Sequence, residues 1–211
     1  MTKQEKALEI MKRLYTAFPQ PKTDLAFTTP MELLVATILS AQATDKLVNT
    51  ITPALFAKYT SVKAFADARV EDIDGLVSKV NFHSNKAKNI QAAAQMIMEK
   101  YGGEVPQTME ELDALPGVAR KTANVVLGSA FGKAEGIVID THGIRLSNRL
   151  GLTTEKKPEK IEQDLMKLLP RDKWIDFGHL ITLHGRYFCT ARPHTCEGCV
   201  LGDLCPEYKS Q

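Results

Sequence analysis

The sequence lacks several features that would assign it to whole classes of protein. No run of about 18 apolar residues occurs in the 211-residue chain, so a membrane-spanning helix is not expected. The start, MTKQEKALEIMKRL, mixes charged residues among apolar ones and therefore does not have the pattern of a signal peptide. Internal repeats and low-complexity linkers are also absent. We expect a cytoplasmic globular protein, because 44% of its residues are apolar and can build a core.

The chain also has little net charge and, over most of its length, no cysteine. Its 27 basic and 25 acidic residues give a net charge of +2, which does not by itself indicate a nucleic-acid partner. Residues 1–188 contain no cysteine, and all four cysteines fall between Cys189 and Cys205. In a reducing cytosol, clustered thiols hold a metal more often than they form disulfides. Four cysteines satisfy either zinc or a four-iron four-sulfur cluster, and spacing alone leaves both open.

Apolar residues recur at helical spacing through most of the chain, whereas alternation at strand spacing is nearly absent. This pattern predicts an all-α protein. Capping boxes at 29–32 and 108–111 mark two helix starts, and glycine or proline marks several helix ends. The expected helices cover residues 3–17, 30–41, 45–58, 61–67, 70–79, 85–101, 108–115, 119–131, 140–151, 155–169 and 172–188.

Positive charge is concentrated in residues 116–150, which contain five basic and two acidic residues. At its start a Pro116-Gly117 turn precedes a helix with Arg120 and Lys121 in its first turn. Proline and glycine suit a tight turn, and the unpaired N–H groups at the start of a helix suit a phosphate. The alternative is an ordinary turn between two helices with solvated basic residues. A Pro-Gly turn alone does not decide between these interpretations.

The longer string LPGVARKTANVVL resembles the helix-hairpin-helix of DNA glycosylases, and KTANVVL narrows the resemblance to the endonuclease III family. Other stretches typical of that family occur in family order: LLVATILSAQATD, FHSNKAKNI, GEVP, VIDTH, HGRYFC and the final cysteines. The resemblance therefore extends over nearly the whole chain. It implies the helix-hairpin-helix DNA glycosylase fold, with a central helical domain at 22–133 and a second helical domain formed by 1–21 plus 134–211.

The resemblance implies a bifunctional DNA glycosylase and abasic-site lyase, which removes oxidised pyrimidines from duplex DNA and cuts the strand 3′ to the abasic site. By resemblance, Lys121 forms a Schiff base with the opened sugar, and Asp140 stabilises positive charge at the anomeric carbon and helps to activate Lys121. A lysine attacks only when neutral, and we expect partial desolvation beside Arg120 to favour that form. Asp140 also suits the N-cap of its helix, which favours an ionised carboxylate.

A base inside the duplex cannot meet Lys121, so it must first be extruded. By resemblance, Gln42 fills the gap that the base leaves, and Phe82 is the apolar wedge, where the family usually has leucine. The alternatives are a glutamine that merely ends a helix and a phenylalanine of the core. We also expect DNA contacts from residues of the hairpin, of the Asp140 helix and of the region around the cysteines: Gly117, Val118, Ala119, Arg120, His142, Arg186 and Arg192.

Six, two and five residues separate the successive cysteines, and this uneven spacing resembles the cluster loop of the endonuclease III family. The resemblance implies that residues 189–205 hold a four-iron four-sulfur cluster with a structural role. Its ligands would be Cys189, Cys196, Cys199 and Cys205.

Two positions depart from the family pattern. Ala119 replaces a second hairpin glycine, and Gly143 lies where a larger residue is usual. If position 119 needs a positive φ, alanine costs roughly 1 kcal/mol there. A glycine inside the Asp140 helix is expected to weaken that helix by roughly 1 kcal/mol.

Two other functions fit parts of the pattern. Mismatch-specific DNA glycosylases share the resemblance, but they typically have serine or tyrosine at the position of Lys121, and neither residue forms a Schiff base. A non-catalytic, metal-stabilised DNA-binding module would use the hairpin to hold phosphate and Lys121 only as a charge. The expected partner is double-stranded DNA with a damaged pyrimidine or an abasic site, bound by a monomer that, in a prokaryote, associates with the nucleoid.

Overall fold

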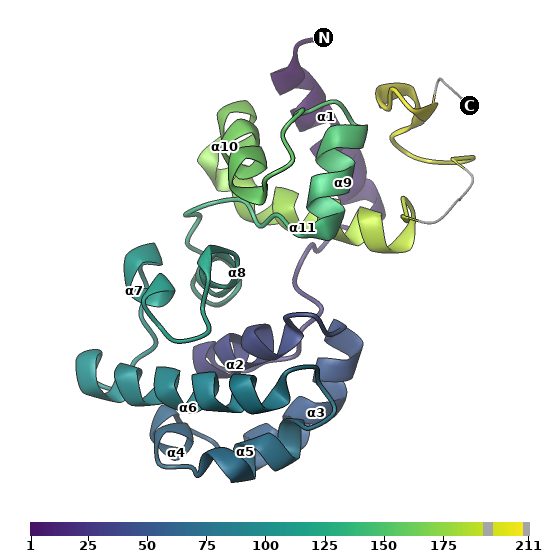
Figure 1. Ribbon diagram of the computed structural model, residues 1–211. Helices are drawn as coiled ribbons and strands as arrows, with labels where there is room; N and C mark the ends of the chain where they lie inside the picture. The colour runs from purple at the N-terminus through teal and green to yellow at the C-terminus, as the bar shows by residue number, and fades with distance from the viewer. Residues whose placement is uncertain (192–195, 209–211) are drawn as a thin grey trace. The chain divides into compact units, whose positions relative to one another are not determined.

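A computed structural model of the chain describes residues 1–191 and 196–208. Within those residues all regular structure is helical, which confirms the predicted all-α class (Figure 1). The chain divides into two compact units, Thr23–Lys133 and the combination of Met1–Lys22 with Ala134–Gln211. No helix in the described part of the chain is long and apolar enough to cross a membrane.

The unit Thr23–Lys133 is built around helix α2 (Pro30–Ser40), in which every residue from Leu33 to Leu39 is buried and all but Thr37 of these are apolar. Helices α3, α6 and α8 pack directly on α2, and α4 and α5 pack on α6. The helices of this unit are α2, α3 (Asp45–Lys58), α4 (Val62–Ala66), α5 (Val70–Val77), α6 (His83–Lys100), α7 (Met109–Asp113) and α8 (Arg120–Phe131).

The two predicted capping boxes have different outcomes. At α2, the Thr29 hydroxyl accepts the Glu32 N–H at 3.2 Å, and the Glu32 carboxylate accepts the Thr29 N–H at 3.3 Å, so this box is confirmed. At α7, the Thr108 hydroxyl accepts the Glu111 N–H at 3.3 Å. The Glu111 carboxylate, however, accepts the Thr108 hydroxyl at 2.7 Å instead of a backbone N–H. Only half of the second box therefore forms.

The unit of Met1–Lys22 and Ala134–Gln211 has its own apolar core, in which Phe177 of α11 is completely buried. Helix α11 packs on α1 and α9, and α10 also contacts both of them. Cys189, Cys199 and Cys205 lie against this core. Its described elements are α1 (Lys3–Ala17), α9 (Thr141–Arg149), α10 (Pro158–Leu168), α11 (Trp174–Tyr187) and the short 3-10 helices η1 (Arg171–Lys173) and η2 (Gly202–Leu204).

Most helices begin and end within two residues of their predicted positions. Helix α10 begins at Pro158 instead of residue 155, because proline at the first helical position cannot use an N–H and fits the start of a helix. Helix α6 begins at His83, two residues before the predicted start, and its N-cap residue Phe82 has a left-handed backbone.

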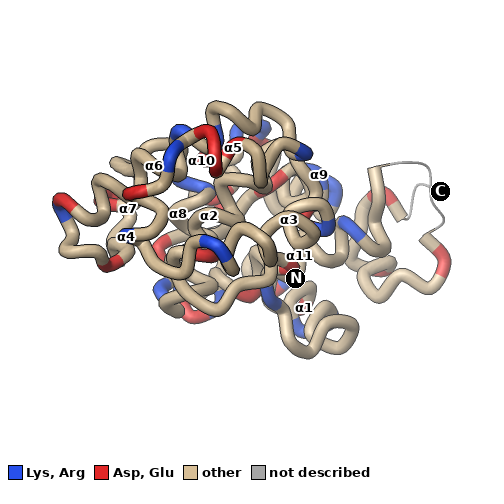
Figure 2. Tube along the Cα trace, turned by 90° about the horizontal axis from the view of Figure 1, so that it is seen from below, with Lys and Arg blue, Asp and Glu red and all other residues tan. Residues whose placement is uncertain are grey.

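Basic and acidic residues are interspersed along both units (Figure 2). Exposed ion pairs such as Arg69 with Asp72, at 2.9 Å, and Arg171 with Glu135, at 2.6 Å, join neighbours of opposite sign. Each such pair contributes about 0–1 kcal/mol to stability. The small net charge of +2 follows from the nearly equal numbers of basic and acidic residues, 27 and 25.

The turn before α8 requires a glycine at position 117. Gly117 has a φ of +76°, and an added Cβ would lie 2.7 Å from the Cβ of Asn89. We therefore expect Gly117→Ala to lower the free energy of unfolding by about 2–4 kcal/mol, measured by urea denaturation. Gly75, in α5, is the matched control, because no atom lies within 4 Å of its added Cβ. Gly75→Ala should keep the stability or raise it by up to about 1 kcal/mol. Equal effects of the two substitutions would contradict the strain assigned to Gly117.

Candidate active site and metal centre

The hairpin turn leads from α7 into α8 and closes through a backbone hydrogen bond. The Val118 N–H donates to the Leu115 carbonyl at 3.1 Å, so this amide serves the turn itself. Ala119 is the N-cap of α8 and has an extended backbone with a φ of −114°. Position 119 therefore does not need a positive φ, and alanine fits there without strain. Ala119 has no side-chain acceptor to cap α8, which leaves room for an anion at the start of this helix.

Lys121 lies in the first turn of α8 and is exposed, as is its neighbour Arg120. The expected partial desolvation of Lys121 is therefore wrong. Its physical reason is that the buried residues of α8 begin only at Ala123, after the first turn of the helix. The exposed side chain leaves the amine accessible to a substrate.

Asp140 is the N-cap of α9, as predicted. Its Oδ1 atom accepts the Gly143 N–H at 2.8 Å, so the carboxylate caps the first turn of α9. A Cβ added to Gly143 would lie 3.6 Å from Asp140 Oδ1 and 3.5 Å from the Cγ2 atom of Ile139, both ordinary contacts. The packing around Gly143 therefore has room for a Cβ atom.

His142, in the first turn of α9, packs against α11. A Cβ added to Gly185 would lie 2.7 Å from the Cβ of His142, so the close approach of the two helices depends on that glycine. The Nδ1 atom of His142 lies 3.2 Å from an Nη2 atom of Arg145, which also donates to the Gly185 carbonyl at 2.9 Å. These contacts fix the ring in place, and its contact with DNA stays a prediction.

Gln42 and Phe82 share an unusual backbone conformation. Both have a φ of +57°, and they are the only residues other than glycine with a positive φ among those described. Such a conformation costs about 1–2 kcal/mol and is often found at functional sites. Phe82 is 63% exposed, so the alternative of a core phenylalanine is wrong. The Asn81 amide donates to the Gln42 carbonyl at 3.2 Å and thereby joins the two loops.

The four cysteines line one cavity of about 440 Å³. All four thiols are free of disulfide bonds. As placed in the described part of the chain, no three His, Cys, Asp or Glu side chains converge closely enough to hold a metal ion. Arg186 is half-buried in the last turn of α11, whereas Arg192 lies outside the described residues. The cavity brings together Cys189, Cys196, Cys199 and Cys205.

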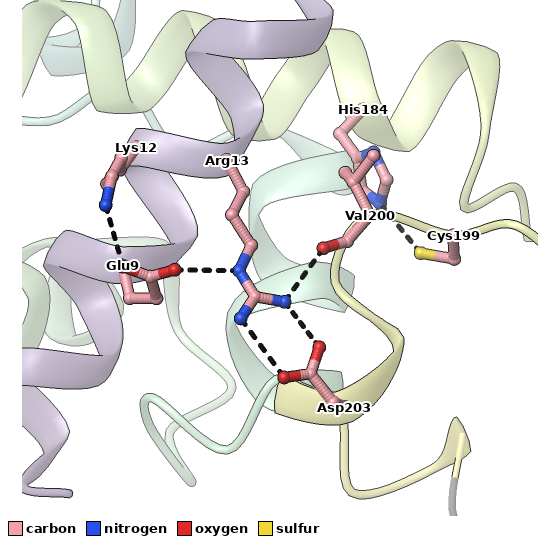
Figure 3. A network of polar contacts seen from close by, with 7 residues as sticks. All are labelled: Glu9, Lys12, Arg13, His184, Cys199, Val200 and Asp203. Carbon is pink, nitrogen blue, oxygen red and sulfur yellow. Dashed lines mark hydrogen bonds and ion pairs between the residues drawn. The ribbon is translucent and has the colours of Figure 1, made fainter.

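An arginine of α1 that was not identified from the sequence binds the cysteine segment (residues 189–205, of which 189–191 and 196–205 are described). The Arg13 guanidinium makes a bidentate ion pair with Asp203, in which the Nη2–Oδ2 distance is 3.1 Å (Figure 3). It also donates to the Val200 carbonyl at 3.2 Å. On the other side, His184 Nε2 lies 3.9 Å from the sulfur of Cys199. Contacts from two helices thus hold this segment.

Two arginines of α9 contact the first cysteine. Arg149 donates to the Cys189 sulfur at 3.2 Å and pairs with Glu207 at 2.7 Å, while Arg145 donates to the Cys189 carbonyl at 2.8 Å. Burial raises the pKa of the Cys199 thiol, and the nearby sulfur atoms of the other cysteines raise it further. The cavity thus concentrates four sulfur atoms beside a guanidinium.

Comparison with known proteins identifies the family of this chain. Residues 35–171 match the model of the HhH-GPD superfamily base excision DNA repair proteins. Endonuclease III of Synechocystis sp. is 51% identical over 97% of this chain and 94% of that protein. Endonuclease III of Escherichia coli K12 is 42% identical over 98% of this chain and 97% of that protein.

Solved structures of endonuclease III and of a DNA glycosylase have the same fold as this chain. A trapped covalent intermediate of endonuclease III with DNA has a TM-score of 0.92 and 39% identity, and covers 100% of this chain and 98% of that one. A thermostable thymine-DNA glycosylase, at 23% identity and a TM-score of 0.87, shares the fold over 98% of each chain. The predicted helix-hairpin-helix glycosylase fold is thereby confirmed, and the chain belongs to the endonuclease III family of the HhH-GPD superfamily of base excision DNA repair proteins.

Proposed function

We propose that this protein is a bifunctional DNA glycosylase and abasic-site lyase acting on oxidised pyrimidines in duplex DNA. The observation that carries the proposal is an exposed lysine, Lys121, in the first turn of α8, directly after the hairpin turn of a chain in the endonuclease III family. A serine or tyrosine there would leave base removal without a Schiff base. The lysine favours the combined activity over a mismatch-specific glycosylase or a DNA-binding module.

In the proposed reaction, the neutral amine of Lys121 attacks the anomeric carbon of the damaged nucleoside. The glycosidic C–N bond breaks, its electron pair leaves with the base, and the base takes up a proton. The sugar ring opens to a Schiff base between Lys121 and the anomeric carbon. Loss of a proton from the neighbouring carbon then expels the 3′ phosphate with the C–O electron pair, which cuts the strand.

Asp140 would stabilise the positive charge that develops on the sugar as the base leaves. Its Oδ1 atom is held by the Gly143 N–H, which fixes the orientation of the carboxylate. Its Oδ2 atom has no hydrogen-bond partner among the described residues and so can face a substrate. An N-cap role and a catalytic role are therefore compatible for the same carboxylate.

The hairpin would hold the DNA strand through its backbone and its charge. Because no side chain caps α8, the amides of its first turn can bind a phosphate, and Arg120 adds positive charge beside them. Gln42 and Phe82, both exposed on strained turns, would enter the duplex as the base leaves it. Damaged duplex DNA is thus the proposed partner.

We also propose a four-iron four-sulfur cluster bound by the four cysteines. Four cysteines that form no disulfide bond line one cavity, and their spacing, which is that of the family, supports this assignment over zinc. When bound, the cluster would cross-link residues 189–205 and supply a structural anchor. The proposed reaction consumes no electron, so none of its steps involves the cluster.

Substitution of Lys121 tests the proposed chemistry. Borohydride reduces a Schiff base to a stable amine, so the wild-type protein should become covalently linked to duplex DNA that contains thymine glycol or an abasic site. We expect Lys121→Gln to lower this trapping by about 1,000-fold or more, because glutamine has no nucleophilic amine. The amount of cross-linked product on a denaturing gel measures the effect.

Lys133→Gln is the matched control for this experiment. Lys133 lies just after α8 and donates to the Gln107 carbonyl, a bond that a glutamine amide can replace. Trapping should therefore stay close to the wild-type level. Undiminished trapping in Lys121→Gln would exclude this lysine as the nucleophile.

The cluster has its own test. The protein purified without oxygen should be brown and contain about four iron and four acid-labile sulfide ions per chain. Cys199→Ser should lose most of both, because its sulfur lies in the cavity with the other three. Thr190→Ser, next to Cys189, is a conservative control and should retain them. Stoichiometric zinc without sulfide in the wild-type protein would contradict the cluster.

A further inference from the structure

The two strained turns at Gln42 and Phe82 need support from the surrounding structure, because a left-handed backbone is unfavourable for both residue types. Gln42 lies just after the end of α2, and Phe82 lies immediately before α6. The sequence separates the two turns by 40 positions, yet the Asn81 amide donates to the Gln42 carbonyl. Tertiary contacts must therefore fix their relative position.

Lys86 makes the buried contacts between these turns. Only 6% of this residue is exposed, although lysine is rarely buried in proteins. Its ammonium donates to the Leu39 carbonyl at 2.9 Å and to the Ala41 carbonyl at 2.5 Å. Its backbone N–H donates to the Phe82 carbonyl at 3.1 Å. One residue thus binds the chain next to Gln42 with its side chain and Phe82 itself with its backbone.

The acceptors of the Lys86 ammonium are the last carbonyls of α2. A helix leaves its final carbonyls without backbone donors, and the negative end of its dipole lies there. The Ala43 N–H satisfies the Ser40 carbonyl at 3.1 Å, and Lys86 satisfies the carbonyls on either side of it. Burial lowers the pKa of Lys86. An apolar side chain at position 86 would leave these two carbonyls without the donor that Lys86 provides.

We propose that Lys86, assisted by Asn81, is a positioning residue that holds the Gln42 and Phe82 turns at a fixed separation, so that both side chains enter the duplex together. This inference rests on the proposed function, in which those two residues extrude the base. Lys86 does not touch the substrate. Its loss should slow only the step for which the two turns must act together.

The test compares two substrates that differ in their need for extrusion. Excision of thymine glycol from a duplex requires the base to leave the stack, whereas borohydride trapping on a single-stranded abasic oligonucleotide does not. We expect Lys86→Met, which keeps most of the length of the side chain but removes the ammonium group, to slow duplex excision by about tenfold or more. Trapping on the single strand should stay within about twofold of wild type.

Two further variants complete the experiment. Lys100→Met changes an exposed lysine at the far end of the same helix and should alter neither readout. Asn81→Ala removes an exposed side chain and only the bond to Gln42, so it should fold normally and slow duplex excision by about threefold. If circular dichroism shows that Lys86→Met does not fold, Asn81→Ala decides the question.

Each outcome has one meaning. Slowing confined to the duplex substrate supports the positioning role. Slowing of both substrates to the same extent overturns it. It is also overturned if neither Lys86→Met nor Asn81→Ala slows the reaction on either substrate. If the wild-type protein neither excises thymine glycol nor forms a covalent product, the proposed function itself fails, and this result is distinct from failure of the positioning role alone.

Discussion

The burial of α2 is the constraint on which the unit Thr23–Lys133 depends. A buried helix satisfies its inner peptide groups by itself, but the N–H groups at its start and the carbonyls at its end need other partners. Thr29 and Glu32 provide them at the start, and the Lys86 ammonium provides them at the end. Because α8 packs on α2, the position of Lys121 in this unit follows from the same helix. The end of α2 thus needs hydrogen-bond donors, and the donor that meets this need, Lys86, lies beside the turns proposed to enter DNA.

Local signals in the sequence predicted most helix boundaries and the N-cap position of Asp140. A threonine or aspartate that caps a helix acts within three residues, so the caps at Thr29 and Asp140 could be predicted without a fold. The burial of Lys86 could not, since its acceptors lie more than 40 positions away. The exposure of Lys121 also depends on which face of α8 packs against α2. Burial of this kind is a tertiary property that residue type does not reveal.

The cysteine segment also has tertiary contacts that could not be predicted from the sequence. Its spacing and its resemblance indicated four ligands, and the structure places all four around one cavity. Neither indicated Arg13, which reaches Asp203 across 190 positions, or Arg149, which donates to the Cys189 sulfur. Both arginines lie on amphipathic helices, where a basic residue usually indicates nothing more than a solvated face. Their role becomes visible only when α1 and α9 are packed in one unit with the cysteines.

The two departures from the family pattern are compatible with the proposed activity, for different physical reasons. Ala119 has an extended backbone, so a methyl group there adds no strain, and the amides that suit a phosphate belong to the residues after it. Gly143 contributes through its N–H, which every residue except proline has, and its surroundings leave space for a Cβ atom. The orientation of Asp140 therefore depends on a backbone hydrogen bond that is independent of side-chain identity at position 143. A hairpin held by Gly117 and a carboxylate held by a backbone amide can both tolerate such changes, because neither uses the side chain that differs.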